Sequence, residues 1–168
     1  MSKCDFILAL CFVCIFSLFT FGYSEADRFF VEGKVYCDTC RAKFVTKISE
    51  YMEGAEVKLE CRNQSTERVT YSMHTTTDET GTYRMPVDGD HEQDICEVFL
   101  IKSGRSDCDE IVREGFVKQT AEVDLTRNNG ISSPVRQANP LGFLIKKPLS
   151  QCTEVLRELG FTSIGALV

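Results

Sequence analysis

The stretch Ala55-Glu56-Val57-Lys58-Leu59-Glu60-Cys61 decides the fold of this 168-residue chain. Apolar and charged residues alternate along it, and a period of two is typical of a β-strand that buries one face and exposes the other. The cysteine that ends the stretch falls on the apolar side. The pattern therefore predicts a half-buried strand with Cys61 facing the core.

Strand patterns recur along the chain. Five further segments are predicted to be strands, namely Phe30–Tyr36, Arg68–His74, Thr82–Val87, Cys96–Lys102 and Thr120–Arg127. The Cys96–Lys102 segment holds four consecutive apolar residues, which predicts a central strand covered on both faces. Turn residues separate the segments, as in Asp78–Gly81.

One segment has the period of a helix. In Gln151–Leu159 the apolar residues fall at positions i, i+3, i+4 and i+7, with Ser150 placed to cap the start and Gly160 to end it. Short strands at regular spacing and a single late helix predict an all-β protein. We expect a β-sandwich or a closed β-barrel of about seven strands with one short C-terminal helix.

The first 24 residues differ in composition from the rest of the chain. After Lys3, the run Phe6–Phe21 is almost wholly apolar, and it is shorter than the roughly 20 residues that a bilayer span needs. Gly22 and Ser24 match the small-x-small pattern of a cleavage site. We therefore predict a secretory signal peptide at residues 1–24 and a single domain at residues 25–168. An uncleaved membrane anchor is the disfavoured alternative, because charged residues follow at once.

The formal net charge of −6 excludes some classes of partner. Lys3 and Asp5 leave together with the predicted signal peptide, so the mature chain keeps the same charge. An acidic chain of this size argues against nucleic acid and against anionic membrane as partners. The sequence predicts a protein secreted into the extracellular space, with no membrane association after cleavage.

Cysteine content supports the same compartment. Of nine cysteines, three lie in the predicted signal peptide, and six remain: Cys37, Cys40, Cys61, Cys96, Cys108 and Cys152. An even number of cysteines behind a secretory signal predicts a framework of three disulfides. Six cysteines allow 15 pairings, and spacing alone does not choose between them.

The motif Cys37-Asp38-Thr39-Cys40 admits three interpretations. A redox dithiol would open a helix within a βαβ unit, whereas this chain is nearly all β. A zinc site would need a second pair at ligand spacing, and Cys96 and Cys108 are too far apart to form one. Two ends of structural disulfides is the favoured interpretation, and we expect no metal and no cofactor.

The two histidines, His74 and His91, lie near neither a nucleophile elbow nor a metalloprotease helix, and both are predicted to be surface residues.

Alternating carboxylates in the loop of residues 88–94 raise a calcium hypothesis; they are Asp88, Asp90, Glu92 and Asp94. The loop lacks the central glycine and downstream glutamate of a calcium loop, so a solvated acidic loop is favoured.

A glycosylation sequon, Asn63-Gln64-Ser65, follows a predicted strand in a polar segment. In a secreted chain, this triplet predicts an N-linked glycan on Asn63.

The ten residues Glu32-Gly33-Lys34-Val35-Tyr36-Cys37-Asp38-Thr39-Cys40-Arg41 resemble the signature of the olive pollen major allergen (Ole e I type) family. That family includes anther-specific proteins expressed late in pollen development. The likeness spans nearly the whole mature chain and continues through short segments: Glu53–Ala55, Leu59–Cys61, Asp90-His91, Cys96-Glu97, Asp107-Cys108, Asn139–Phe143, Cys152 and Leu159-Gly160.

The resemblance implies a disulfide pairing of Cys37 with Cys108, Cys40 with Cys152, and Cys61 with Cys96. It also implies an extracellular plant glycoprotein without known catalytic activity. Some family members are pollen allergens, and some are implicated in pollen hydration and tube growth through contact with receptor kinases.

Three functions compete. The first is a non-enzymatic extracellular protein that binds a receptor or a cell-wall component. The second is a small-ligand carrier with a barrel cavity, lined by Phe30, Phe99 and Phe143 if these do not fill the core. The third is a secreted enzyme, for which the sequence offers no nucleophile–base–orienter set. The binding protein is favoured.

Overall fold

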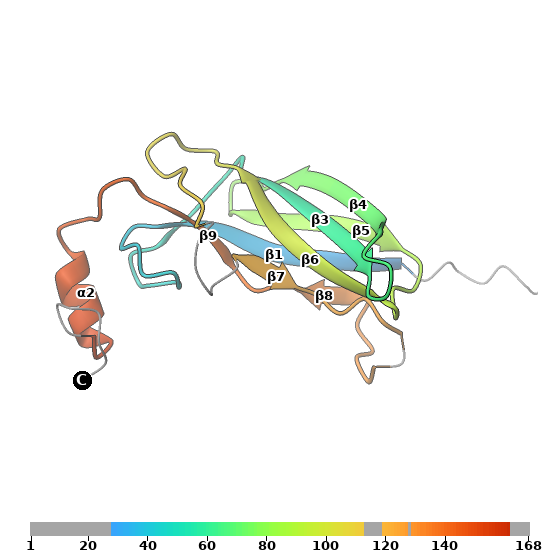
Figure 1. Cartoon of the computed structure of the whole chain (residues 1–168). Coiled ribbons are helices and arrows are strands. Elements are labelled where there is room, and N and C mark those ends of the chain that lie inside the picture. The colour runs from blue at the N-terminus through green and yellow to red at the C-terminus, as the bar shows by residue number, and fades with distance from the viewer. Residues whose placement is uncertain (1–27, 113–118, 128, 162–168) are drawn as a thin grey trace, which may run out of the picture.

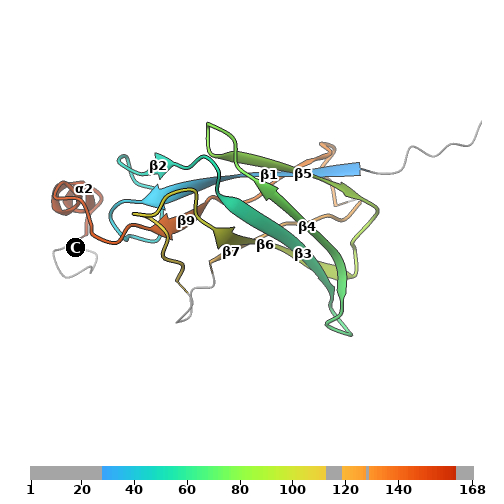
Figure 2. The same ribbon diagram turned by 90° about the horizontal axis from the view of Figure 1, so that it is seen from above.

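The computed structural model describes residues 28–112, 119–127 and 129–161. Two β-sheets pack face to face as a sandwich, and a short helix, α2, lies beyond one end of it (Figure 1). The view from above shows the strands of one sheet running obliquely to those of the other, with α2 again apart from both (Figure 2).

The first sheet is organised around one long strand. β1 (Arg28–Asp38) pairs antiparallel with β2 (Glu50–Tyr51) and β5 (Thr82–Asp88). It also pairs in parallel with β8 (Val135–Gln137) and β9 (Leu141–Leu144). Because four strands share β1, this strand carries the connectivity of the whole sheet.

The second sheet is antiparallel throughout, in the order β4-β3-β6-β7. Its strands are β4 (Val69–Thr76), β3 (Glu56–Asn63), β6 (Asp94–Lys102) and β7 (Thr120–Glu122). The alternating residues Glu56–Cys61 belong to β3, one of the two central strands.

The core lies between the sheets and is filled by side chains from both. Val57, Leu59 and Cys61 of β3 are fully buried, as their alternation predicts. Facing residues of the first sheet, such as Val31 and Met85, are equally buried. Pairing and burial together confirm the sandwich, and the closed barrel is excluded because the strands form two separate sheets.

The strand predictions differ from the structure in three places. β2, β8 and β9 were not expected, because strands of two to four residues are too short to show a period. The predicted strand at Thr120–Arg127 forms its ladder only over Thr120–Glu122. β6 is central but its outer face is not covered, since Ile95 and Ile101 are 45% and 41% exposed.

Only one of the three phenylalanines considered for the core lies in it. Phe143 on β9 is fully buried. Phe30 is partly buried beneath the guanidinium of Arg84, whose Cζ lies 4.3 Å from the ring centroid. Phe99 is partly buried on β6. The strand period places Phe30 and Phe99 on the outer faces, opposite to their buried neighbours.

Helix α2 spans Cys152–Glu158, close to the predicted range. Its N-cap is Gln151, which makes no side-chain capping bond, so the predicted cap at Ser150 is wrong. Gly160 ends the helix at φ 86°, and the N–H of Phe161 donates to the Leu156 carbonyl at 2.9 Å. Within the described ranges, no helix has the length and apolar character needed to cross a bilayer.

Candidate functional site

Disulfides fix the end of the sandwich at which β1 finishes. Cys37 is bonded to Cys108 with a Cα–Cα distance of 6.0 Å, and Cys40 to Cys152 with 5.3 Å. The third bridge, Cys61–Cys96, joins directly opposed residues of β3 and β6 at 4.0 Å. These are the three pairs that the family resemblance implied, and they give the Cys37–Cys40 motif a structural role at each of its two sulfurs.

Asp38 organises the turn between these two cysteines. Its side chain is fully buried, and its carboxylate oxygens accept hydrogen bonds from the backbone N–H of Cys40 at 3.2 Å and of Lys43 at 2.6 Å. A buried carboxylate that accepts backbone N–H groups fixes the path of the loop around it.

Arg41 clamps the same loop to the strands behind it. Its backbone adopts φ 55°, an unusual conformation for a residue with a side chain. Its Nη1 donates to Glu110 Oε2 at 2.6 Å and to the Ile145 carbonyl at 2.7 Å. The guanidinium therefore joins the loop after β1 to two segments distant in sequence.

The other signature residues also hold structure. Val35, Tyr36 and Thr39 are buried, and burial raises the pKa of Tyr36 to about 12. Gly33 lies against Tyr83, so that a Cβ at residue 33 would be 2.4 Å from the Tyr83 hydroxyl oxygen. Glu32 and Lys34 face outward: Glu32 lies 3.6 Å from Arg84, and the Lys34 Nζ lies 4.4 Å from the centroid of the Tyr51 ring. The signature thus encodes the frame of this end of the sandwich, and we find no reactive group in it.

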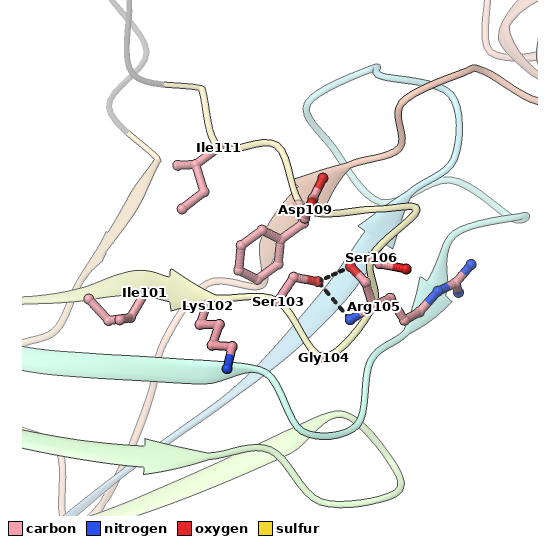
Figure 3. A pocket seen from close by; sticks show the side chains of 9 residues that line it. Ile101, Lys102, Ser103, Gly104, Arg105, Ser106, Asp109 and Ile111 are labelled. Carbon is pink, nitrogen blue, oxygen red and sulfur yellow. Dashed lines mark hydrogen bonds between the residues drawn. The ribbon is translucent and has the colours of Figure 1, made fainter.

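A surface hollow of about 510 Å³ lies beside this frame, at the end of β6 (Figure 3). It is lined by Ile101, Lys102, Ser103, Gly104, Arg105, Ser106, Asp109, Ile111 and Phe143. Three of these residues are apolar (Ile101, Ile111 and Phe143) and three are charged (Lys102, Arg105 and Asp109), a mixture that occurs at recognition sites. Sequence reasoning missed it, because the hollow arises where the loop after β6 meets β9.

Hydrogen bonds hold Ser103 and Arg105 in place on the wall of the hollow. The Ser103 hydroxyl donates to the Cys108 carbonyl at 2.7 Å. It accepts from the Arg105 N–H at 3.0 Å (Figure 3). Arg105 pairs with Asp107 at 2.8 Å and with Glu50, and these contacts raise the pKa of its guanidinium. These hydrogen bonds and ion pairs restrain the wall of the hollow.

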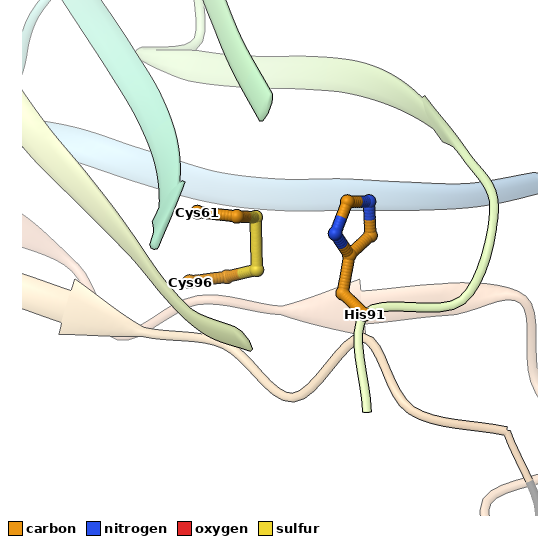
Figure 4. A group of neighbouring side chains, drawn as sticks. All are labelled: Cys61, His91 and Cys96. Atoms are coloured by element: carbon orange, nitrogen blue, oxygen red, sulfur yellow. A yellow bond between two sulfur atoms is a disulfide. The ribbon is translucent and has the colours of Figure 1, made fainter. Parts of the chain in front are cut away.

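His91 departs most from its predicted place. Its side chain is only 9% exposed, so the prediction of a surface histidine is wrong for this residue. Nδ1 lies 2.9 Å from Asp94 Oδ2, and Nε2 is buried without a hydrogen-bond partner. The ring is directed toward the Cys61–Cys96 bridge (Figure 4). His74, in contrast, is exposed and lies 3.1 Å from Glu56.

The carboxylates of the acidic loop, residues 88–94, contact different residues and do not converge on one point. Asp88 pairs with Arg28 at 2.7 Å, whereas Asp94 accepts hydrogen bonds from Thr70 at 2.7 Å and from His91. Burial raises the pKa of Asp94, but the hydrogen bonds from Thr70 and His91 outweigh it and hold the pKa below its usual range. Across the described ranges, no group of three or more carboxylates lies within metal-ligand distance.

Asn63 lies at the start of the loop between β3 and β4. Its Oδ1 accepts from the N–H groups of Ser65 at 3.2 Å and Thr66 at 3.1 Å, which forms an Asx turn. Its Nδ2 donates to the Gln93 carbonyl at 3.4 Å. The sequon is therefore presented on an exposed turn.

The comparisons with known proteins agree with the fold. A family model described as Pollen protein Ole e 1 like matches residues 27–160. An Olee1-like protein of Betula pendula is 60% identical over 152 residues, covering 90% of this chain and 89% of that protein. The Anther-specific protein LAT52 of Solanum lycopersicum is 50% identical, with coverages of 92% and 94%.

A solved structure supports the same assignment. The crystal structure of the major plantain pollen allergen Pla l 1 matches with a TM-score of 0.68 and 42% sequence identity, covering 74% of this chain and 99% of that chain. The family match covers most of the chain, and it includes the Glu32–Arg41 segment. The chain therefore belongs to the Pollen protein Ole e 1 like family.

Proposed function

We propose that this protein is a secreted, non-enzymatic pollen protein that binds an extracellular partner protein through the hollow at the end of β6. The observation that carries the proposal is the hollow itself, in which the exposed Ile101 lies beside charged residues, and Arg105 among them is held by its ion pair with Asp107. An exposed apolar side chain next to fixed charges supplies the mixed contacts of a protein–protein interface. Pollen hydration and tube growth, by way of a receptor, are the processes in which we place it.

The compartment is part of the proposal. Three disulfides persist only where the surroundings are oxidising, which supports secretion after removal of residues 1–24. Those residues lie outside the described ranges.

A protein partner is favoured over a wall polysaccharide by the lining of the hollow. Sugar rings stack on exposed aromatic faces, and the one aromatic residue that lines the hollow, Phe143, is fully buried. A partner protein that offers an apolar side chain flanked by charges fits the hollow better. In the lining, the apolar Ile101 is 41% exposed and is followed by the charged Lys102.

The carrier and the enzyme are less well supported. Among the described residues, large side chains such as Tyr83, Leu59 and Phe143 are fully buried between the sheets, which argues against a ligand cavity there. Each histidine contacts a carboxylate, His74 with Glu56 and His91 with Asp94, instead of a serine or threonine hydroxyl. A general base poised on a hydroxyl nucleophile is not supported by this arrangement.

Affinity capture from pollen extract tests the proposal with a matched pair of variants. Ile101→Glu places a charge in the lining of the hollow, and Ile95→Glu places the same charge on the outer face of the same strand at its other end. Wild type and Ile95→Glu should retain the same protein, and Ile101→Glu should lose it. Equal retention by Ile101→Glu would contradict the hollow as the site, and retention of polysaccharide alone would favour a wall component.

A further inference from the structure

We propose that the free edge of strand β4 (Val69–Thr76) is a dimerisation surface, on which β4 of a second copy of this chain pairs antiparallel about a two-fold axis. β4 is the last strand of the second sheet, and β3 is the strand it pairs with (Figure 1). Its eight residues form a row of backbone groups long enough to bind another strand. Addition of a strand to such an edge is an established mode of protein recognition.

Every second residue of β4 directs its backbone groups away from β3. Just beyond the strand, the Thr77 N–H donates to the Ala55 carbonyl at 2.9 Å, so residue 77 faces the β3 side. Because the direction of the backbone groups alternates along a strand, Ser72, His74 and Thr76 present their N–H and C=O groups at the free edge. In the part of the chain that the structure describes, none of these backbone groups has a protein partner.

Among the described strands, β4 is the one long edge that lacks a feature opposing further pairing. β5, an edge of the first sheet, contains Pro86, which has no N–H to donate. The strands β2, β7, β8 and β9 have only two to four residues each. Within Val69–Thr76 there is no proline, lysine, arginine or carboxylate. Sheet proteins ordinarily keep free edges short or charged, so a long uncharged edge indicates a strand that acquires a partner.

Charge favours a second copy in antiparallel orientation as that partner. A two-fold axis at Met73 sets Ser72 of each copy opposite His74 of the other, which pairs the outward backbone groups of both. The same register brings Arg68, which is exposed and makes no ion pair within the described ranges, to Asp78 of the other copy. Opposite charges therefore meet at both ends of the paired strands. The uncharged ladder between them lets two chains of net charge −6 approach closely.

The core-side residues of β4 support the same axis. Tyr71, Met73 and Thr75 are partly buried, and because the sheet ends at β4, their remaining exposed surface lies along its edge. In the proposed register, Met73 meets Met73 of the second copy in a pair without hydrogen bonds, where Cα atoms lie about 4.5 Å apart. Tyr71 then lies opposite Thr75. Dimerisation thus covers apolar surface that one copy leaves open.

The dimer goes beyond the proposed function, because no residue of β4 lines the hollow at the end of β6. Each copy contributes one hollow. Two joined sites bind an array of partner molecules more tightly than one site does. Loss of the dimer and loss of partner capture by Ile101→Glu are therefore separate observations.

Sedimentation velocity of the mature protein over a range of concentrations tests the dimer. The mass of the wild type should rise from that of one chain toward twice that value. Ser72→Pro removes an N–H that does not bond to β3, so the fold should remain. It should weaken dimerisation by roughly tenfold or more, because each dimer loses two hydrogen bonds. Ser72→Thr, the control, keeps the N–H and should dimerise as the wild type does. A wild type that stays monomeric at every concentration overturns the proposal.

Amide exchange of the wild type, followed by NMR, locates the interface without any variant. Exchange at Ser72 and His74 should slow as the concentration rises, whereas Met73 and Thr75, which bond to β3, should be protected at every dilution. A dimer that leaves exchange at Ser72 and His74 unchanged overturns the proposal, since another surface then pairs. Protection of these two amides in a monomer, only after addition of pollen extract, also overturns it and identifies a strand of another protein as the occupant.

Discussion

The carboxylate of Asp38 accepts a hydrogen bond from the backbone N–H of Lys43 at 2.6 Å, deep beneath the loop that joins the first two bridged cysteines. Asp38 is fully buried and also accepts from the N–H of Cys40. This one side chain therefore satisfies two backbone donors that the irregular loop leaves without a ladder partner.

Replacement of Asp38 by alanine should destabilise the fold by about 2–4 kcal/mol, because each buried donor that loses its acceptor costs about 1–3 kcal/mol. Urea unfolding followed by circular dichroism measures the change. Asp109→Ala is the matched control, since Asp109 is exposed and its pair with Lys146 is long at 3.3 Å. The control should change stability by less than about 0.5 kcal/mol. Equal effects in the two variants would contradict the role given to Asp38.

The bridge from Cys40 to Cys152 connects α2 to the sandwich, and its removal should have a local effect. Helix α2 lies beyond the end of the sheets (Figure 1) and has seven residues, too few to be stable alone. In Cys40→Ser/Cys152→Ser we expect fast amide exchange and early proteolysis in Cys152–Glu158, with the strands of β3 and β6 still protected.

The bridge from Cys61 to Cys96 supplies the contrast. It lies inside the core between two central strands, so Cys61→Ser/Cys96→Ser should lower protection throughout both sheets and reduce the unfolding free energy by about 2–4 kcal/mol. Hydrogen exchange measured by mass spectrometry distinguishes the two patterns. Global loss of protection in the Cys40/Cys152 variant would contradict the local role.

Periodicity predicted the long strands and failed at the short ones for a physical reason. In Ala55–Cys61 one face is buried against the other sheet and one face meets water, so the sequence alternates. Leu141–Leu144 of β9 is buried on both faces and has only four residues, which leaves no alternation to detect. Nothing local marks β8, because its pairing with β1 is set by tertiary contact.

Of the candidate site, only the signature segment and its disulfides were predictable from the sequence. The Glu32–Arg41 signature pointed to the family and to the bridges, and the structure places it at one end of the sandwich. The hollow beside it depends on how the loop after β6 folds over Phe143, which no pattern of Ser103–Asp109 encodes. The burial of His91 was not predictable either, because the acidic residues around it in the sequence do not show that the folded loop places it opposite the Cys61–Cys96 disulfide.

The buried hydroxyl of Tyr83 has no hydrogen-bond partner, and burial raises its pKa well above the ordinary value of 10. Burying an unpaired hydroxyl costs about 1–3 kcal/mol. Tyr83→Phe should therefore leave stability unchanged or raise it by about 1 kcal/mol. Tyr71→Phe, the control, loses a hydrogen bond to the Pro86 carbonyl at 3.0 Å and should cost about 0.5–1.5 kcal/mol. Thermal unfolding should therefore show a lower Tm for Tyr71→Phe and an unchanged or higher Tm for Tyr83→Phe, and a clearly lower Tm for Tyr83→Phe would contradict the unpaired hydroxyl.

Glycosylation at Asn63 is tested in protein from its native host. Treatment with an N-glycosidase should increase electrophoretic mobility, because the sequon lies on the exposed turn after β3. Ser65→Ala should give the same mobility as the treated wild type without treatment. Unchanged mobility of the wild type after treatment would refute the glycan.

The acid stability of the second sheet should depend on Glu60. The hydrogen bond from Lys58 and that from Arg62 lower the pKa of Glu60 below the ordinary 4.5, against the opposing effect of burial. A carboxylate whose pKa is lower in the folded state stabilises the fold above its ordinary pKa, and this contribution is lost as the pH falls through the folded value.

Glu60→Gln should therefore be less stable than wild type at pH 7 by about 1–2 kcal/mol. The difference should shrink below pH 4.5, where the protonated glutamate and the glutamine carry the same charge. Denaturant unfolding across this pH range measures the convergence, with the exposed Glu92→Gln as control. A gap between wild type and Glu60→Gln that stays constant down to pH 2 would show that packing, and not the charge of Glu60, accounts for the loss.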